Sequence, residues 1–291
     1  MGYQAIATQD LWSQYQEQLD QNTPTVVWVQ QGQTSRFLQA SRYRGLPSMM
    51  YLMDAQYNPE QVRLAADQGV AIVCLSAFLA THVSRNVGCH AETLYPIIDQ
   101  TPRPQMNESG VGAKQNGYVL MVNAYAQKGV GTFLTLAALL PDVRFLLQEA
   151  WPLSSQQMSW LRQQLTGLPN VTFQRSVMDM MPVYDGASML IVPSVWQEGF
   201  GMVAVEAQAA GKPVIASHIG GLPESVGSGG ILISDHDNPI AWANAITTLR
   251  NDSTTYARLI HQGYESLQRE EFSEKRVVEK FEQITNQLIH R

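Results

Sequence analysis

The sequence offers little for a disulfide-stabilised, zinc-binding or nucleic-acid-binding protein. Its 291 residues include only two cysteines, Cys74 and Cys89, which are too few for a disulfide framework, and no Cys-x-x-Cys pair for zinc. Charged residues make up 15%, the formal net charge is −6 and no basic run occurs, so we expect no nucleic-acid partner. No uninterrupted stretch of about 18 apolar residues occurs, so none is expected to span a membrane.

The amino-terminal residues carry no apolar core of the kind that directs export, and the few cysteines suit a reducing compartment. We therefore expect a cytoplasmic protein. The isoelectric point near 5.5 argues against strong attachment to an anionic membrane, and a local patch that holds the protein peripherally at the inner membrane face is the alternative.

Short apolar runs alternate with amphipathic segments along the whole chain, which is typical of βαβ units in a parallel sheet. We predict strands at 25–30, 48–53, 70–75, 92–97, 118–123, 144–148, 171–175, 189–192, 213–217 and 230–234. We predict helices at 10–21, 35–44, 59–67, 77–87, 132–139, 155–165, 202–210, 239–250 and 273–289. The fold class is therefore α/β.

The composition changes at 101–117, where prolines, glycines and polar residues without periodicity indicate an interdomain linker. We expect a short Rossmann-like domain at 1–107, a second Rossmann-like domain at 108–272, and a helix at 273–291 that packs back on the first domain. Ligands of open parallel sheets bind outside the carboxyl ends of the strands. The loops that follow Asn123, Ser194 and Ser217 are therefore the expected binding region.

The most informative segment runs from 193 to 206. A predicted strand ends in Pro-Ser, a loop with Glu198, Gly199 and Gly201 follows, and a helix starts near Met202. Glycines let the backbone approach a ligand, and the free N–H groups of a helix start bind anions. Glu198 and Glu206 would repel phosphate, so we expect them to hydrogen-bond hydroxyls on either side of it. A nucleotide sugar has that chemistry.

The Glu198-x7-Glu206 spacing resembles the hallmark of the retaining group 1 glycosyltransferases, the family of glycogen and sucrose synthases. The resemblance covers roughly 117–250 and is thin over 47–99. Further matching segments are Asn123–Gly129, Asn170–Phe173, Tyr184–Ser188, Pro193–Ser194, Ala207–Ala216 and Gly220–Glu224. The resemblance implies the GT-B fold, in which two Rossmann-like domains face a cleft, with the first domain binding the acceptor and the second the donor.

The resemblance also implies a role for each matching residue. Glu198 would bind hydroxyls of the transferred sugar near its anomeric carbon, and Lys128 would neutralise the diphosphate of the leaving group. Glu206 would accept hydrogen bonds from the ribose hydroxyls. No cofactor or metal ion is expected, because Lys128 and a helix dipole replace the metal in this fold. The backbone that would hold the sugar and diphosphate belongs to Gly199, Phe200, Gly201 and Met202.

Two positions depart from the family pattern in the donor-binding half. Asn123 stands where the family usually has an arginine, and it can donate hydrogen bonds but carries no charge. Arg175 stands where the family commonly has glycine. Our hypothesis is that Arg175 restores the missing charge at the diphosphate, and the alternative is a surface arginine.

The first half departs further, because it is shorter than the family's acceptor domain. Asp54 stands near the place of the histidine that many members carry. We therefore expect a remodelled acceptor site, or one completed by a partner chain or a second copy of this chain.

The resulting hypothesis is a retaining transferase that moves a hexose-like sugar from a UDP-, GDP- or ADP-sugar to a hydroxyl acceptor in glycan or cell-envelope polysaccharide synthesis. The acceptor would be a glycan, a lipid-linked glycan, a peptide or a small molecule. The alternative is a degenerate, non-catalytic GT-B subunit that binds nucleotide and a partner transferase. Another GT-B enzyme, an epimerase or a phosphorylase, is a further alternative.

Overall fold

The computed structural model describes residues 10–22, 24–32, 35–100 and 117–290. The described residues form two compact units, one from 10–96 with 275–290 and the other from 97–274. The predicted linker, apart from Gly117, and the predicted domain boundary between residues 107 and 108 lie outside the described residues. Each unit is built on its own parallel sheet, as the alternation of apolar and amphipathic segments predicted.

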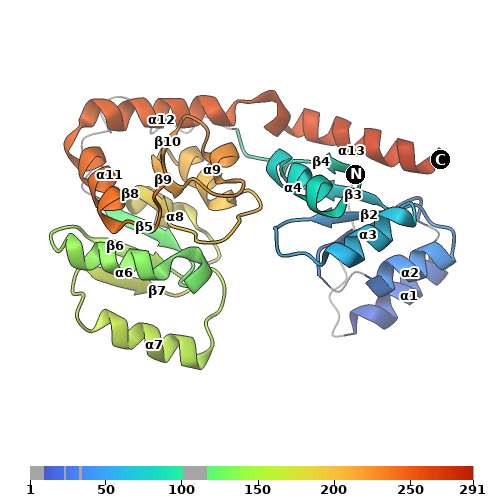
Figure 1. Cartoon of the computed structure of the whole chain (residues 1–291), viewed down its shortest axis with the longest axis horizontal. Coiled ribbons are helices and arrows are strands. Elements are labelled where there is room, and N and C mark those ends of the chain that lie inside the picture. Colours follow the sequence, from blue (N-terminus) through green and yellow to red (C-terminus); the bar gives the residue numbers. More distant parts are fainter. Residues whose placement is uncertain (1–9, 23, 33–34, 101–116, 291) are drawn as a thin grey trace. The chain divides into compact units, whose positions relative to one another are not determined.

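The first unit holds a four-stranded parallel sheet in the order β1-β2-β3-β4, of which Figure 1 labels β2, β3 and β4. Its inner strand β2 is buried along its whole length, which explains the uninterrupted apolar run there. The strands are β1 (Val27–Gln30), β2 (Ser48–Leu52), β3 (Ala71–Cys74) and β4 (Ala91–Thr93). The helices are α1 (Leu11–Gln21), α2 (Ser35–Tyr43), α3 (Pro59–Asp67), α4 (Ala77–Val87) and α13 (Glu274–Ile289).

The carboxyl-terminal helix α13 packs on this first unit. Phe281 lies against Trp28 of β1, with ring centroids 5.3 Å apart, and the Lys280 ammonium pairs with the Glu92 carboxylate of β4 at 2.7 Å. Hydrogen bonding from Lys280 holds the pKa of Glu92 below its ordinary value. Side chains of the last helix therefore pack on strands that lie far away in the sequence.

The second unit holds a six-stranded parallel sheet in the order β10-β9-β8-β5-β6-β7. Its strands are β5 (Tyr118–Val122), β6 (Phe145–Gln148), β7 (Val171–Gln174), β8 (Ala187–Val192), β9 (Val214–Ser217) and β10 (Gly230–Ile233). Its helices are η3 (Ala126–Lys128), α6 (Val130–Leu139), α7 (Ser155–Leu165), α8 (Met181–Gly186), α9 (Met202–Ala209), α10 (Leu222–Val226), α11 (Pro239–Asn251), α12 (Ser253–Leu267) and η4 (Glu270–Phe272).

Alternate residues of the central strand β5 enter two separate cores. Val119 and Met121 pack with residues of α6, α11 and α12, whereas Leu120 and Val122 pack with residues of α8, α9 and α10. The sheet therefore carries helices on both faces. Its strand order changes direction between β5 and β8, which is the switch point where open α/β sheets bind ligands.

The structure corrects the sequence prediction in two kinds of places. The strand predicted at 92–97 ends at Thr93, and Pro96 has no N–H to continue a ladder. Three helices, α8, α10 and α12, were not predicted. In α12, Gly263 allows close packing on the Gln208 side chain, which lies 3.1 Å from where a Cβ would stand.

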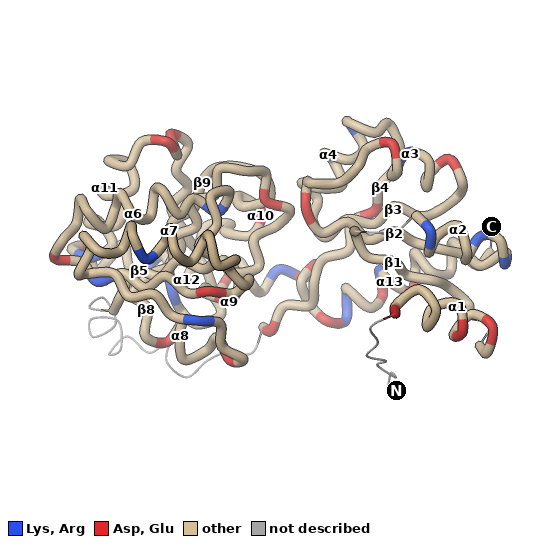
Figure 2. Tube along the Cα trace, turned by 90° about the horizontal axis from the view of Figure 1, so that it is seen from below, with Lys and Arg blue, Asp and Glu red and all other residues tan. Residues whose placement is uncertain are grey.

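Charge is spread thinly over both units. Figure 2 shows Lys and Arg positions interspersed with Asp and Glu along the described chain of each unit. Within the described residues, no helix combines the length and apolarity that a membrane crossing requires. The described His, Cys, Asp and Glu residues form no group of three or more able to hold a metal ion.

Candidate functional site

The loops after β5 and β8 meet at the switch point of the second unit. Gly129 ends η3 with a φ of 84°, and a Cβ there would lie 1.8 Å from the carbonyl oxygen of Pro193. Only glycine allows so close an approach. The Val195 N–H donates to the Gln127 carbonyl at 3.0 Å, which ties the two loops together. This contact brings the Lys128 side chain to the residues that follow β8.

An ion pair forms where the two loops meet. The Lys128 ammonium donates to both carboxylate oxygens of Glu198, each at 2.8 Å, and Ser194 Oγ donates to Glu198 Oε1. The two side chains are 16% and 8% exposed, so water screens the pair only weakly. The structure therefore brings together the two residues that the sequence predicted as catalytic, although they are 70 positions apart in the sequence.

Two indole rings flank the same ammonium. Lys128 Nζ lies 4.9 Å from the ring centroid of Trp151 and 4.8 Å from that of Trp196. Both distances are within the range of a cation–π interaction. The sequence analysis did not single out either tryptophan, although Trp151 follows the predicted strand 144–148 and so stands at the carboxyl end of a strand.

The start of α9 supplies backbone N–H groups beside this pair. Gly201 precedes the helix with a φ of 97° and has no side chain with which to cap the first turn. The first N–H groups of a helix favour an anion. The phenyl ring of Phe200 is buried against Phe272, with ring centroids 5.7 Å apart, so Phe200 has only its backbone to offer a ligand.

Gly220 and Gly221 hold the loop that carries Glu198. A Cβ on Gly220 would lie 2.5 Å from both the N and the O atom of Glu198, and the Gly221 N–H donates to the Glu198 carbonyl at 2.7 Å. These glycines therefore do more than make a turn between β9 and α10. They allow one backbone to lie against another and fix the position of Glu198.

Glu206, the second acidic residue of the motif, lies on α9 and is half-buried. The Tyr184 hydroxyl donates to Glu206 Oε2 at 2.7 Å. Burial, together with the nearby Glu206 carboxylate, raises the pKa of Tyr184, so the tyrosine stays a hydrogen-bond donor. This bond engages one carboxylate oxygen and orients the group.

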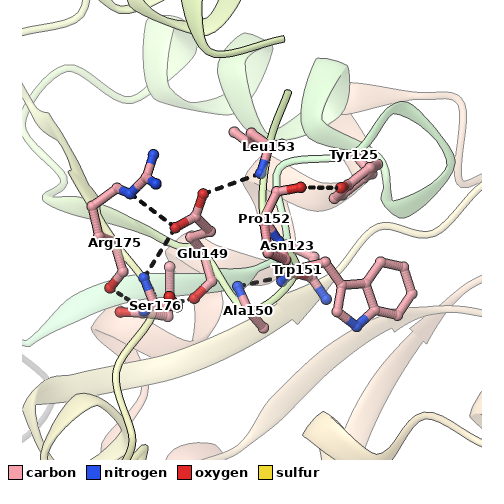
Figure 3. A network of polar contacts seen from close by, with 10 residues as sticks. Asn123, Tyr125, Glu149, Ala150, Trp151, Pro152, Leu153, Arg175 and Ser176 are labelled. Carbon is pink, nitrogen blue, oxygen red and sulfur yellow. Dashed lines mark hydrogen bonds and ion pairs between the residues drawn. The ribbon is translucent and has the colours of Figure 1, made fainter. Parts of the chain in front are cut away.

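Asn123 and Arg175 are held in a polar network at the carboxyl ends of β5, β6 and β7 (Figure 3). Asn123 Oδ1 accepts from the N–H groups of Ala150 at 3.1 Å and Trp151 at 2.7 Å. Arg175 Nε pairs with the buried Glu149 carboxylate at 3.1 Å, and the Arg175 side chain is 66% exposed. The hypothesis that Arg175 supplies charge to a diphosphate stays a prediction.

Figure 3 shows Arg175 and Trp151 on opposite sides of Glu149. The predicted site residues therefore form two groups. Lys128, Glu198 and the start of α9 meet at the switch point, while Asn123 and Arg175 join the loops after β6 and β7. The residues that sequence reasoning missed are Trp151, Trp196, Tyr184 as the partner of Glu206, and Glu149 as the partner of Arg175.

Comparison with known proteins identifies relatives of the second unit. Residues 117–252 match the family model for Glycosyl transferases group 1. The D-inositol 3-phosphate glycosyltransferase of Corynebacterium glutamicum is 47% identical over 83 residues, which is 28% of this chain and 19% of that protein. Its counterpart in Mycobacterium sp. (strain KMS) is 40% identical over 131 residues, 42% of this chain and 29% of that protein. The matched segments thus span less than a third of these relatives.

Solved structures resemble the whole chain. HepE from Anabaena, in complex with UDP-glucose, covers 96% of this chain and 81% of its own with a TM-score of 0.73 and 21% identity. Sucrose-phosphate synthase from Thermosynechococcus elongatus covers 95% of this chain and 76% of its own with a TM-score of 0.78 and 20% identity. At these identities the likeness shows the fold, which confirms the predicted GT-B architecture of two parallel-sheet domains. Residues 117–252 therefore match the group 1 glycosyltransferase family, as the Glu-x7-Glu motif predicted.

Proposed function

We propose that this protein transfers a hexose-like sugar from a nucleoside-diphosphate sugar to a hydroxyl acceptor, with retention of the anomeric configuration and without a metal ion. The observation that carries the proposal is the Lys128–Glu198 pair, which stands beside the start of α9 at the switch point of the sheet. The family match of this domain and the UDP-glucose complex of HepE support the same reading, and UDP-glucose is the first donor to test.

Each group of the site has a matching part in such a donor. The Lys128 ammonium and the N–H groups at the start of α9 neutralise the diphosphate. Glu198 accepts hydrogen bonds from hydroxyls of the transferred sugar. Glu206, which already accepts from Tyr184, accepts from the ribose hydroxyls. A cation with two carboxylates eight residues apart suits a ligand that carries both phosphates and hydroxyls.

The proposed reaction breaks the bond between the anomeric carbon and the diphosphate oxygen and forms a bond between that carbon and the acceptor oxygen. The acceptor proton moves to the departing phosphate on the same face of the sugar, which retains the configuration. Lys128 stabilises the charge that develops on the leaving group, an effect that grows where water is excluded. The acceptor is a glycan, a lipid-linked glycan, a peptide or a small molecule, in glycan or cell-envelope polysaccharide synthesis.

The test is a donor screen with the full chain. UDP-, GDP- and ADP-sugars are incubated with pooled acceptors in the presence and absence of EDTA, nucleotide release is followed, and the product's anomeric configuration is read by NMR. Glu198→Gln and Lys128→Met should each lower turnover by about 100-fold or more. The surface variant Glu265→Gln on α12 is the matched control and should match the parent chain.

Three outcomes of this screen count against the proposal. If Glu198→Gln turned over donor as fast as the parent, the Lys128–Glu198 pair would not be required for the reaction. Inversion of the anomeric configuration would refute the mechanism. Tight nucleotide binding without release of nucleotide from any donor would favour the alternative, a non-catalytic subunit that binds nucleotide and a partner transferase.

A further inference from the structure

The Lys128 ammonium is enclosed on three sides. The Glu198 carboxylate is at 2.8 Å, and the rings of Trp151 and Trp196 lie 4.9 and 4.8 Å away by their centroids. We call the two indoles the aromatic box. A lysine side chain has four rotatable carbon–carbon bonds, and ordering it on ligand binding lowers affinity. The box therefore fixes a group that would otherwise be flexible.

Two residues of the loop after β5, Asn123 and Tyr125, contact Trp151 and its neighbours. Asn123, in the left-handed region with a φ of 73°, accepts hydrogen bonds from the backbone N–H groups of Ala150 and Trp151. Tyr125 packs edge-on to the Trp151 ring at 5.6 Å and donates its hydroxyl proton to the Pro152 carbonyl at 2.7 Å. Asn123 therefore helps to position the Trp151 ring through the backbone of its loop.

Glu149 anchors the other end of the same loop. Its carboxylate accepts from the Leu153 N–H at 3.2 Å and the Ser176 N–H at 3.1 Å, as well as from Arg175 (Figure 3). These contacts tie the loop after β6 to the loop after β7. Trp151 nevertheless remains 43% exposed, so its ring is both fixed and accessible.

Trp196 contacts the Lys128 ammonium through the face of its ring and not through its N–H group. Its Nε1 atom is buried and has no hydrogen-bond partner among the described residues. Burying an unsatisfied N–H group is unfavourable, so an offsetting contact is required. The contact with the Lys128 ammonium supplies one.

We propose that Trp151 and Trp196 are positioning residues that hold the Lys128 ammonium at the diphosphate subsite. This inference rests on the proposed function. The box keeps the lysine in one geometry and partly removes its water, which strengthens its attraction to phosphate. The cation–π contacts with the two rings remain when Glu198 turns to the sugar hydroxyls.

The test measures UDP affinity of the full chain by calorimetry. Trp151→Ala should bind UDP about tenfold more weakly, equivalent to about 1.4 kcal/mol, whereas Trp151→Phe should recover much of the loss because a phenyl face also attracts a cation. Trp196→Phe should weaken binding less than Trp151→Ala does. The control is Trp160→Ala, an exposed tryptophan on α7 of the same unit, which should bind like the parent.

A second arm separates positioning from general damage. In a Lys128→Met background, Trp151→Ala should have no further effect on UDP affinity, because the rings act through the ammonium. A tenfold loss that persists in that background would overturn the inference, as would unchanged or tighter binding by Trp151→Ala in the parent. A parent chain that binds neither UDP nor inorganic pyrophosphate would instead refute the proposed function itself.

Discussion

Substitutions of Lys128 and of Glu198 should lower the free energy of unfolding by different amounts. Lys128→Met leaves the Glu198 carboxylate, 8% exposed, with Ser194 as its remaining side-chain partner among the residues that the structure describes. Removing one partner of a buried ion pair typically lowers the free energy of unfolding by about 3–5 kcal/mol. The Lys128 side chain is slightly more exposed, at 16%, which places the expected loss near the lower end, about 3 kcal/mol.

Glu198→Gln should be milder. The glutamine amide oxygen still accepts from Lys128 and Ser194, and the ammonium keeps its two indole faces. The expected loss is about 1 kcal/mol, the value of a typical hydrogen bond. The double variant leaves no buried charge at this site, so it should lose far less than the sum, with a coupling free energy of about 2 kcal/mol.

The assay is urea unfolding followed by far-UV circular dichroism for the four members of this cycle. Lys275→Met, which removes an exposed ammonium 3.9 Å from Glu279, is the control and should shift the free energy of unfolding by under about 0.5 kcal/mol. Additive losses in the double variant, or a Lys128→Met loss no larger than that of the control, would refute the idea that the pair is buried and coupled.

Two further predictions concern the parts that position the site and the last helix. Gly129→Ala should lower the free energy of unfolding by more than about 2 kcal/mol and abolish UDP binding. The reason is that a Cβ would lie 1.8 Å from the Pro193 carbonyl oxygen and that the positive φ adds strain. A variant as stable as the parent would show that the loop relaxes without loss. Lys280→Gln should lower the free energy of unfolding by up to about 1 kcal/mol at neutral pH. The lowered pKa of Glu92 contributes stability at pH values above the ordinary pKa of a glutamate, and this stability is lost as the pH falls through the lowered pKa. A difference between variant and parent that stays constant in urea titrations down to acid pH would contradict this.

The fold could be predicted from local pattern to a large extent. Apolar runs of four to six residues mark nine of the ten strands to within about two residues, since parallel strands are buried on both faces. The sequence pattern did not predict the structure correctly where tertiary contacts determine whether a segment is a helix or a strand. Gly263 stands inside α12 because that helix packs on Gln208, and the strand at β4 stops three residues before Pro96.

The site could be predicted only in its sequence-local part. The acidic spacing of Glu198 and Glu206 and the helix start at Met202 lie within one short segment, so they can be found without a structure. The aromatic box could not, because Trp151 and Trp196 are 45 positions apart and meet only through the Lys128 ammonium.

By itself the sequence determined the alternation of strands and helices, the group 1 motif, and the residue types able to bind phosphate and hydroxyls, because these depend on neighbours along the chain. The tertiary structure alone decided that Lys128 faces Glu198, that Asn123 supports Trp151, and that Arg175 pairs with Glu149. These contacts depend on the strand order β8-β5-β6-β7, which places the ends of distant strands side by side. Local pattern does not encode that order, because any parallel arrangement buries the same apolar runs.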